Sequence, residues 1–321
     1  MRIIVTGGYG FIGSNFILYW LKKHKKDEIV NVDKLTYAAD PDNLKDVNDK
    51  TDYTFVNGDI ADKEFVEKTF KDADVIVNFA AESHVDNSIK NSDLFLMSNV
   101  VGVHNILETV RKTGIRFHQI STDEVYGSLP LNSKTKFNEA SKYNPRNPYS
   151  ATKAAADFLV RAYYNTYKLP VTISNCSNNY GMNQHPEKLV PKTVLNAYLD
   201  REIPVYGDGR QVRDWIFVED HCSAVESIIK KGQHGETYLI GENGEKRNID
   251  VVRSILKKMN KPESLIKFVE DRPGHDARYA IDSRKIQKEL GWEPKFSFEK
   301  GIKITIEHYL KNRERYLKRM E

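Results

Sequence analysis

A tyrosine and a lysine lie four residues apart in the chain, at Tyr149 and Lys153. On a helix, this spacing places both side chains on one face. A lysine ammonium near a phenol stabilises the phenolate and lowers the pKa of the tyrosine, so Tyr149 could act as a base near neutral pH. Because Tyr-x-x-x-Lys occurs by chance in many helices, the pair indicates chemistry only in combination with other motifs.

The segment Thr122-Asp123-Glu124 follows a predicted strand and carries one hydroxyl and two carboxyl groups. In a parallel sheet, the carboxyl ends of the strands face the ligand crevice. Two neighbouring carboxyl groups can serve as an acid and a base when unlike environments separate their pKa values. Alternatively, Asp123 and Glu124 could be a capping and surface pair at a strand-to-loop turn. Without the surrounding motifs, this second interpretation would be preferred.

A glycine-rich turn, Gly7-Gly8-Tyr9-Gly10-Phe11-Ile12-Gly13, lies between a predicted strand and a predicted helix. Its glycines allow a tight turn, close approach of the backbone to a pyrophosphate and close helix–strand packing, and the helix N-terminus offers free N–H groups. Asp33 ends the second predicted strand, 20 residues after Gly13. Its carboxylate can accept hydrogen bonds from the adenosine ribose and would repel a 2′-phosphate, which predicts NAD rather than NADP.

The elements that would position these residues follow from the hydrophobic pattern. Short β-branched runs alternate with amphipathic stretches, which predicts an α/β fold with a Rossmann-like, doubly wound parallel sheet. Asp59-Ile60 follows the third strand, where it could grip an adenine edge or form an ordinary helix cap. Strands are expected at 3–5, 29–33, 53–56, 75–79, 116–120 and 171–174, and helices at 11–23, 93–112 and 149–167.

After Cys176 the sequence becomes loop-rich and polar, with short helices, single strands and Gly or Pro breaks. We therefore predict an NAD-binding domain over residues 1–176, which receives strands or helices from about 210–240, and a smaller C-terminal substrate lobe over 177–321. The basic C-terminus, 311–321, is expected to be a solvated helix end.

Composition argues against several classes of protein. With 321 residues, 40% apolar and 29% charged, the chain is neither disordered, collagen-like nor a coiled coil. Its 49 basic and 45 acidic residues leave a net charge of +4, a weak bias that does not indicate a nucleic-acid partner. Two cysteines are typical of reduced thiols in a cytoplasmic protein. No apolar run approaches the roughly 18 residues of a membrane span, and the histidines show no metal-binding spacing.

Together these residues resemble the extended short-chain dehydrogenase/reductase family. Over nearly the whole chain, further segments are similar to its branch of dTDP-glucose 4,6-dehydratases: 33–38, 80–86, 122–124, 175–181, 186–191 and 271–276. The Asp123-Glu124 pair is the most discriminating feature, because epimerases and decarboxylases of this fold generally lack it. The segment Met182-Asn183-Gln184 departs from the pattern of the branch, which usually has a proline and an aromatic residue there. This departure concerns the shape of the loop and not the chemistry.

The resemblance implies a hydro-lyase that converts dTDP-glucose to dTDP-4-keto-6-deoxyglucose, in rhamnose-type deoxysugar nucleotide biosynthesis. NAD⁺ would remove hydride from C4 while Tyr149, supported by Lys153, takes the hydroxyl proton and Thr122 hydrogen-bonds the same oxygen. Glu124 would then take the C5 proton, and Asp123 would protonate the C6 hydroxyl as it leaves as water. NADH would finally return hydride to C6 while a proton returns to C5, so the cofactor ends unchanged.

The resemblance also indicates binding residues. Arg213 suits a diphosphate, because a guanidinium can clamp phosphate through two hydrogen bonds, although a surface salt bridge with Asp214 is a common alternative. Cofactor contacts are expected at Gly7, Gly10, Phe11, Ile12, Gly13, Asp33, Lys34, Thr36, Asp59, Ile60, Ala80, Ala81, Ser83, Asn99, Tyr149 and Lys153. Substrate contacts are expected at His84, Thr122, Asn178, Lys188, Leu189, Val190, Pro204, Val205, Tyr206, Arg213, Asn248, Arg272 and His275. For Tyr206 the alternative is a buried core tyrosine.

Three other functions stay open: a nucleotide-sugar 4-epimerase, a 4,6-dehydratase of another nucleotide sugar, and a non-catalytic NAD-binding protein. The Asp123-Glu124 pair argues against the epimerase, and the presence of Thr122, Tyr149 and Lys153 argues against a binding protein.

In relatives of this fold, the helices at 93–112 and 149–167 pair across a two-fold axis, and here both carry apolar residues beyond one stripe. We therefore expect a cytoplasmic homodimer that binds a nucleotide sugar and neither nucleic acid nor membranes.

Overall fold

The computed structural model of the chain describes residues 1–271 and 273–320. Its larger sheet has seven strands in the order β10-β6-β5-β4-β1-β2-β3, and all neighbouring strands are parallel. The predicted Rossmann-like fold is therefore confirmed, and each predicted strand is present with its ends shifted by at most two residues. The strands are β1 (Arg2–Thr6), β2 (Glu28–Asp33), β3 (Tyr53–Asn57), β4 (Val75–Asn78), β5 (Arg116–Thr122), β6 (Val171–Cys176) and β10 (Thr237–Ile240).

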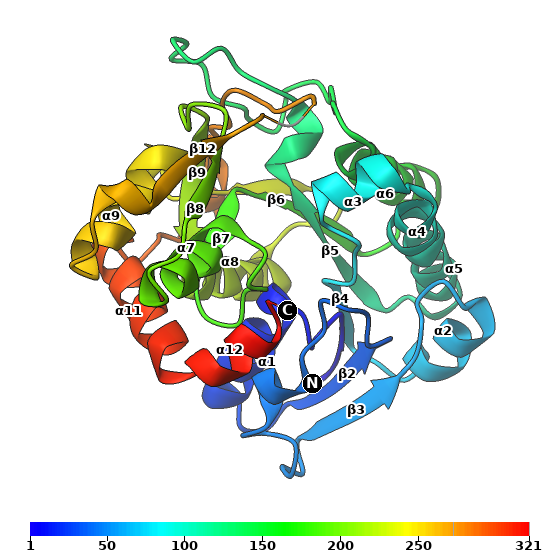
Figure 1. The fold of residues 1–321 in the computed structure, drawn as a ribbon. Coiled ribbons are helices and arrows are strands. Elements are labelled where there is room, and N and C mark those ends of the chain that lie inside the picture. Colours follow the sequence, from blue (N-terminus) through cyan, green and yellow to red (C-terminus); the bar gives the residue numbers. More distant parts are fainter. Residues whose placement is uncertain (272, 321) are drawn as a thin grey trace.

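Helices cover both faces of this sheet (Figure 1). Successive residues of a strand point to opposite faces, so Ile3 and Val5 pack into one hydrophobic core while Ile4 packs into the other. The first core is covered by α1 (Phe11–Lys23), α8 (Val218–Lys231) and α10 (Arg284–Leu290), and the second by α2 (Lys63–Phe70), α5 (Gly102–Thr113) and α6 (Pro148–Tyr167).

The predicted helix at 93–112 is not a regular α-helix along its whole length. It consists of α4 (Asp93–Phe95), a π-helical turn η2 (Leu96–Val101) and α5. π-helical turns widen a helix locally and are frequent at functional sites. Here the wide turn contains Asn99, which is buried and faces the loop after β4.

A smaller lobe contains two further sheets. β7 (Asn178–Tyr180), β9 (Val212–Phe217) and β11 (Glu245–Arg247) form one, and β8 (Ile203–Tyr206) pairs with β12 (Ile266–Val269) in the other. The chain leaves this lobe after β9, contributes α8 and β10 to the larger domain, and returns. The other helices are α3 (Val85–Lys90), α7 (Leu189–Tyr198), α9 (Asn248–Lys258), α11 (Phe298–Lys311), α12 (Arg313–Lys318) and the 3₁₀ turns η1 (Pro41–Leu44), η3 (Asp123–Tyr126) and η4 (Glu263–Leu265).

The expectation of a solvated C-terminal helix end is wrong for α12. Tyr316 is buried, and the guanidinium of Arg315 lies 2.6 Å from the carboxylate of Asp40. Figure 1 shows the C-terminus beside α1 and the first strands of the chain. The cause is that Tyr316, Arg315 and Arg319 lie on the side of the chain end that faces the larger domain. Lys318 stays exposed.

Two kinds of feature are absent from the part of the chain that the structure describes. None of its helices combines the length and apolar character of a membrane span. Within the same residues, no group of three or more His, Cys, Asp or Glu side chains is arranged to hold a metal ion.

Candidate active site

Three adjoining cavities follow the carboxyl edge of the large sheet. The cofactor cavity lies between Gly7, Asp33, Asp59 and Ala80, and shares Gly7 with the central cavity, which contains Tyr149. The outer cavity lies between the two domains and shares residues with the central one. The shared residues are Ser83, Glu124, Asn178, Glu187 and Lys188. The arrangement gives one continuous cleft in which a long ligand could lie.

The glycine-rich turn leaves no room for side chains at the rim of the cofactor cavity. Gly7 has a φ of +68°, and a Cβ atom there would lie 2.7 Å from the backbone nitrogen of Ala80. A Cβ atom on Gly13 would lie 2.3 Å from the carbonyl oxygen of Gly7, so α1 can pack this closely only with glycine. The N–H groups of the first turn of α1 have no carbonyl partner within the helix, which suits an anion such as a pyrophosphate.

Asp33 is held at the edge of the cofactor cavity by two backbone groups. Its carboxylate accepts hydrogen bonds from the backbone N–H of Tyr9 at 3.0 Å and of Leu35 at 2.8 Å. Burial raises the pKa of Asp33, and the two N–H groups oppose that shift. The side chain is therefore oriented before any ligand arrives.

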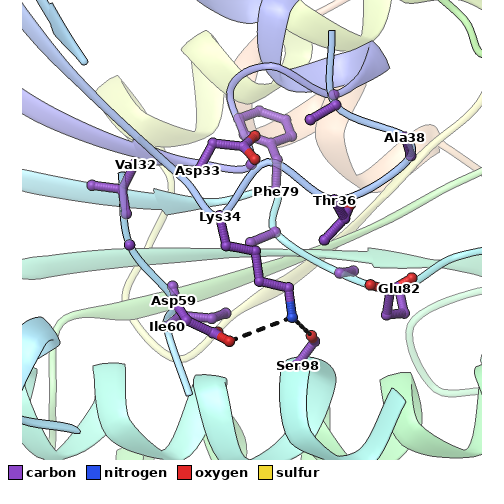
Figure 2. Close-up of a pocket in the computed structure, with 16 residues that line it drawn as sticks. Val32, Asp33, Lys34, Thr36, Ala38, Asp59, Ile60, Phe79, Glu82 and Ser98 are labelled. Atoms are coloured by element: carbon purple, nitrogen blue, oxygen red, sulfur yellow. Dashed lines mark hydrogen bonds and ion pairs between the residues drawn. The ribbon is translucent and has the colours of Figure 1, made fainter. Parts of the chain in front are cut away.

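Figure 2 shows the opposite wall of the cofactor cavity, where Lys34 reaches towards Asp59 and Ser98. The Lys34 ammonium lies 3.4 Å from the Asp59 carboxylate and 3.1 Å from the Ser98 hydroxyl. The helix-cap interpretation of Asp59 is wrong, because Asp62 caps α2 by accepting a hydrogen bond from the N–H of Phe65.

The central cavity brings together all five predicted catalytic residues. They come from two elements: the carboxyl end of β5 with the adjoining η3, and the first two turns of α6. Asn147 starts α6 with a capping box that includes Ser150, which fixes the end of the helix on which the tyrosine lies. The five residues are Thr122, Asp123, Glu124, Tyr149 and Lys153.

The two carboxyl groups of this cavity have different surroundings. Asp123 is 2% exposed, and its Oδ2 atom makes no hydrogen bond to a described residue. Burial, and then the negative charge of Glu124, hold the pKa of Asp123 well above its usual range. Glu124 is half-buried at the border with the outer cavity, where the Asn147 amide approaches it at 3.4 Å. The surroundings therefore favour a protonated Asp123.

The expected lowering of the Tyr149 pKa is wrong for the protein alone. Burial raises the pKa of Tyr149 well above its usual value, the Glu124 carboxylate adds to this, and a hydrogen bond with the Thr122 hydroxyl works in the opposite direction. The Lys153 ammonium donates a hydrogen bond to the carbonyl of Ile120 at 2.6 Å. The sequence pattern places Lys153 on the right face but does not reveal how many acids surround the phenol.

Asp157 is a residue of this site that sequence reasoning missed. It is fully buried and accepts hydrogen bonds from Ser121 at 2.7 Å, Tyr143 at 2.9 Å and Asn175 at 3.1 Å. Its charge raises the pKa of the buried Lys153, against the larger effect of burial. A signal existed in the sequence, since Asp157 lies four residues after Lys153 on the same helix face.

Asn99 does not line the cavities but supports them. Its amide donates hydrogen bonds to the carbonyl of Glu82 and the hydroxyl of Thr152, both at 3.0 Å, and its oxygen accepts one from the N–H of Glu82 at 2.9 Å. It thus ties the loop after β4 to the helix that carries Lys153. The other predicted cofactor residues line the cofactor or central cavity.

Ten of the predicted substrate residues line the outer cavity. Thr122 lies in the central cavity instead, the Val190 side chain is buried in the core of the small lobe, and Arg272 lies outside the described residues. Tyr206 is 43% exposed, so the core-tyrosine alternative is wrong. The ten are His84, Asn178, Lys188, Leu189, Pro204, Val205, Tyr206, Arg213, Asn248 and His275.

Arg213 is buried and held in place from several sides. It donates hydrogen bonds to the carbonyls of Val212 at 2.8 Å and Asp276 at 2.9 Å, and its guanidinium lies 4.2 Å from the ring centre of Tyr279. A surface salt bridge is therefore the wrong interpretation. A buried, fixed guanidinium beside a cavity is suited to an anionic ligand.

Comparisons with known proteins agree with this geometry. A sequence model of the family described as GDP-mannose 4,6 dehydratase matches residues 4–305. A dTDP-glucose 4,6-dehydratase of Mycobacterium tuberculosis is 49% identical over 313 residues, which cover 97% of this chain and 94% of the relative. The fold of the present chain is similar to the crystal structure of a dTDP-glucose 4,6-dehydratase from Bacillus anthracis in complex with NAD. The TM-score is 0.93, the sequences are 45% identical, and the match covers 99% of each chain.

A second solved structure gives a higher TM-score of 0.96. It is a dTDP-glucose 4,6-dehydratase from Streptomyces venezuelae with NAD and TYD bound, 40% identical, and the match covers 99% of this chain and 100% of the other.

Proposed function

The chain belongs to the dTDP-glucose 4,6-dehydratase family of extended short-chain dehydrogenases/reductases, and we infer from this membership that it converts dTDP-glucose to dTDP-4-keto-6-deoxyglucose. The observation that carries the inference is the central cavity, in which the acidic pair Asp123-Glu124 lies with Thr122, Tyr149 and Lys153. An epimerase needs a base for the hydroxyl proton but no acid–base pair for the loss of water.

The cofactor cavity fits NAD. Its glycines let a pyrophosphate approach the backbone, and the oriented carboxylate of Asp33 can accept hydrogen bonds from ribose hydroxyls while it repels a 2′-phosphate. When bound, NAD supplies the acceptor for the C4 hydride and returns the hydride to C6. Lys153 is proposed to reach both the phenol of Tyr149 and the nicotinamide ribose.

We assign the first proton transfer to Tyr149. As hydride leaves C4, its phenolate takes the proton of the C4 hydroxyl, and Thr122 donates a hydrogen bond to the same oxygen. The Thr122 hydroxyl also lowers the pKa of Tyr149, which opposes the effect of burial. The ketone formed at C4 acidifies the hydrogen at C5.

The elimination is assigned to the acidic pair. Glu124 takes the C5 proton, and Asp123 gives its proton to the C6 hydroxyl, which leaves as water. When the hydride has been returned to C6, a proton returns to C5. The deep burial of Asp123 supports its role as the acid, because a carboxyl group kept neutral can donate a proton. The position of Glu124 at the border of the central and outer cavities supports its role as the base, because a sugar in the cleft would lie against it.

Incubation with individual nucleotide sugars tests the function. We expect the purified protein to convert dTDP-glucose to a 4-keto product lighter by one water, detected by mass spectrometry, and to convert UDP-, CDP- and GDP-glucose more slowly. Denatured protein should release NAD⁺ or NADH rather than NADPH. A 4-epimer of the sugar without loss of water would assign the chain to the epimerase alternative.

A homodimer is also proposed. Large apolar side chains are exposed on the adjacent helices α4, η2 and α6: Leu94, Leu96, Met97, Phe158 and Tyr167. Exposed apolar patches of this kind mark association surfaces, and a second copy with the same patch would cover it. Sedimentation at micromolar concentration should give a dimer, and the Leu94→Glu/Phe158→Glu double variant should give a monomer.

We further propose a cytoplasmic location, which fractionation of the source cells would test.

A further inference from the structure

Two loops form walls of the cofactor and central cavities. The 34–43 loop follows β2, and the 181–188 loop follows β7. Both contribute lining residues: Lys34, Thr36, Ala38 and Ala39 from the first, and Gln184, His185, Glu187 and Lys188 from the second. The contacts that hold these loops therefore influence how a dinucleotide enters and leaves.

The C-terminal helix α12 and Arg319, which caps it, bind the 34–43 loop through two arginines. Arg315 donates two hydrogen bonds to the Asp40 carboxylate, at 2.9 and 2.6 Å. Arg319 donates to the carbonyl of Ala39 and to that of Tyr37, both at 3.1 Å. The main chain of the loop is thus fixed at Tyr37 and Ala39, and its side chain at Asp40.

The same end of the chain also holds the 181–188 loop. The hydroxyl of Tyr309 in α11 donates a hydrogen bond to the carbonyl of Gln184 at 2.7 Å. The hydroxyl of Tyr316 in α12 donates to the Asn183 side chain at 3.4 Å, and the Asn183 amide donates to the hydroxyl of Ser14 in α1 at 3.3 Å. Both walls are therefore connected to the C-terminal helices.

A chain of hydrogen bonds continues from α12 to the ribose-facing carboxylate. The N–H of Asp40 donates to the carbonyl of Tyr9 at 3.0 Å, and the Asn43 amide donates to the same carbonyl at 3.0 Å. Arg315 also binds the side-chain oxygen of Asn43. The N–H of Tyr9 in turn holds Asp33. A shift of the 34–43 loop would therefore disturb the glycine-rich turn and Asp33 together.

Charge makes this connection sensitive to the arginines. Asp40 is 8% exposed, and both Arg315 and Arg319 lie within 3.1 Å of its carboxylate. Loss of both guanidinium groups would leave a buried carboxylate without its two cationic partners and, among the described residues, with only the backbone N–H of Asp42 as a donor, which is far more costly than loss of an exposed ion pair. The loop would have to move to hydrate Asp40.

We propose that Arg315 and Arg319 are positioning residues for the dinucleotide: they hold the 34–43 loop against the glycine-rich turn and thereby slow the release of NAD. The proposal rests on the proposed function only in requiring that the chain binds NAD. It assigns to two residues near the C-terminus a role in a cavity whose lining comes from residues 7–98.

Release of NADH from the purified enzyme tests the proposal. NADH bound to the full-length protein is displaced with excess NAD⁺ in a stopped-flow instrument, and its fluorescence gives the dissociation rate. For Arg315→Ala/Arg319→Ala we expect roughly ten-fold faster release, because changes within one binding site act mainly on the dissociation rate. The NAD concentration that gives half-maximal activity should rise more than kcat falls.

Three further variants separate positioning from general stability. Lys318→Ala, in the same helix but exposed, should release NADH at the parent rate. Arg315→Lys should give an intermediate rate, because an ammonium can pair with Asp40 but cannot bind Asp40 and Asn43 with a planar fork. Tyr316→Phe removes only a hydroxyl and should release NADH about two-fold faster, at the small end of such effects.

The thermal unfolding temperature of each variant is measured together with its NADH release rate, so that a loss of folding is recognised. Parent-like release from an Arg315→Ala/Arg319→Ala protein that is folded would overturn the proposal, as would equally fast release from Lys318→Ala. If the double variant does not fold, parent-like release from Arg315→Lys overturns it. A parent protein that binds NADH but does not dehydrate dTDP-glucose would refute the proposed function and leave this comparison intact. A parent protein that binds no dinucleotide would refute both.

Discussion

The cofactor cavity and the outer cavity differ in the protein groups that line them. The wall of the first along the glycine-rich turn consists of small side chains and main-chain groups at the ends of neighbouring strands, with Gly7, Gly10 and Ala80 as examples. Long polar and aromatic side chains from both domains line the second, among them Arg213 and Tyr206. The central cavity, with the predicted catalytic residues, lies between them.

This difference predicts how each cavity responds to change. A site made of main chain is determined by the path of the backbone, so that one added carbon atom is enough to block it. A site made of side chains depends on hydrogen bonds and packing that hold each group, so that conservative changes weaken it by degrees. Variants of the two cavities should therefore affect different ligands.

The largest effect on activity is expected from Tyr149→Phe, in the central cavity between the other two. Removal of the base should slow hydride removal from C4 by roughly 10²- to 10⁴-fold, while NADH titration should show that the variant still binds the dinucleotide through the glycine-rich turn. Because burial raises the pKa of Tyr149, formation of enzyme-bound NADH by the parent should increase as pH rises towards that pKa. A Phe variant that oxidises the sugar at the parental rate would exclude Tyr149 as the base.

Asp123→Asn should have the next largest effect. Elimination should slow by roughly 10²-fold or more, so that NADH accumulates transiently and its absorbance can be followed. The raised pKa of Asp123 keeps it protonated, so in the parent the elimination step should slow as pH rises through that pKa. The Asn variant should lose this pH dependence.

Glu124→Gln is the matched change at the other carboxyl group, and it should suppress exchange of the C5 hydrogen with solvent deuterium. Elimination at the parental rate in both variants would mean that another pair performs the chemistry.

Gly7→Ala tests the main-chain cavity. The new Cβ atom would meet the backbone of Ala80, and overpacking of about 1–3 kcal/mol corresponds to roughly five- to 150-fold weaker NADH binding. Gly114→Ala is the control, because Gly114 also has a positive φ, of +75°, but has open space around it. Both variants should lose about 1 kcal/mol of stability from the strained backbone, measured by urea unfolding. Equal loss of NADH affinity in both would contradict the steric explanation.

Arg213→Lys tests the side-chain cavity and should have the smallest effect. We expect the KM for dTDP-glucose to rise about ten-fold, or about 1.4 kcal/mol, because an ammonium cannot reproduce the planar fork of the buried guanidinium. NADH binding should stay at the parental value. The comparison between the cavities fails if Arg213→Lys weakens NADH and dTDP-glucose equally.

The parts of the protein that could be predicted from the sequence are those determined by neighbouring residues. The glycine-rich turn, the strand that ends at Asp33 and the apolar strand β4 each follow from a short stretch whose backbone preferences are local. The outer cavity was predicted differently, since resemblance to a family rather than spacing indicated residues such as Arg213.

Only the tertiary structure decided features that depend on distant partners. Burial, and then the charge of Glu124, raise the pKa of Tyr149 although Lys153 lies on the same helix face. Asp157 collects hydrogen bonds from three separate segments, and the charged C-terminal helix packs against Asp40 instead of facing solvent. The physical reason is that desolvation and charge act through space, whereas the periodicity of a sequence reports only the conformation and the exposed side of each local element.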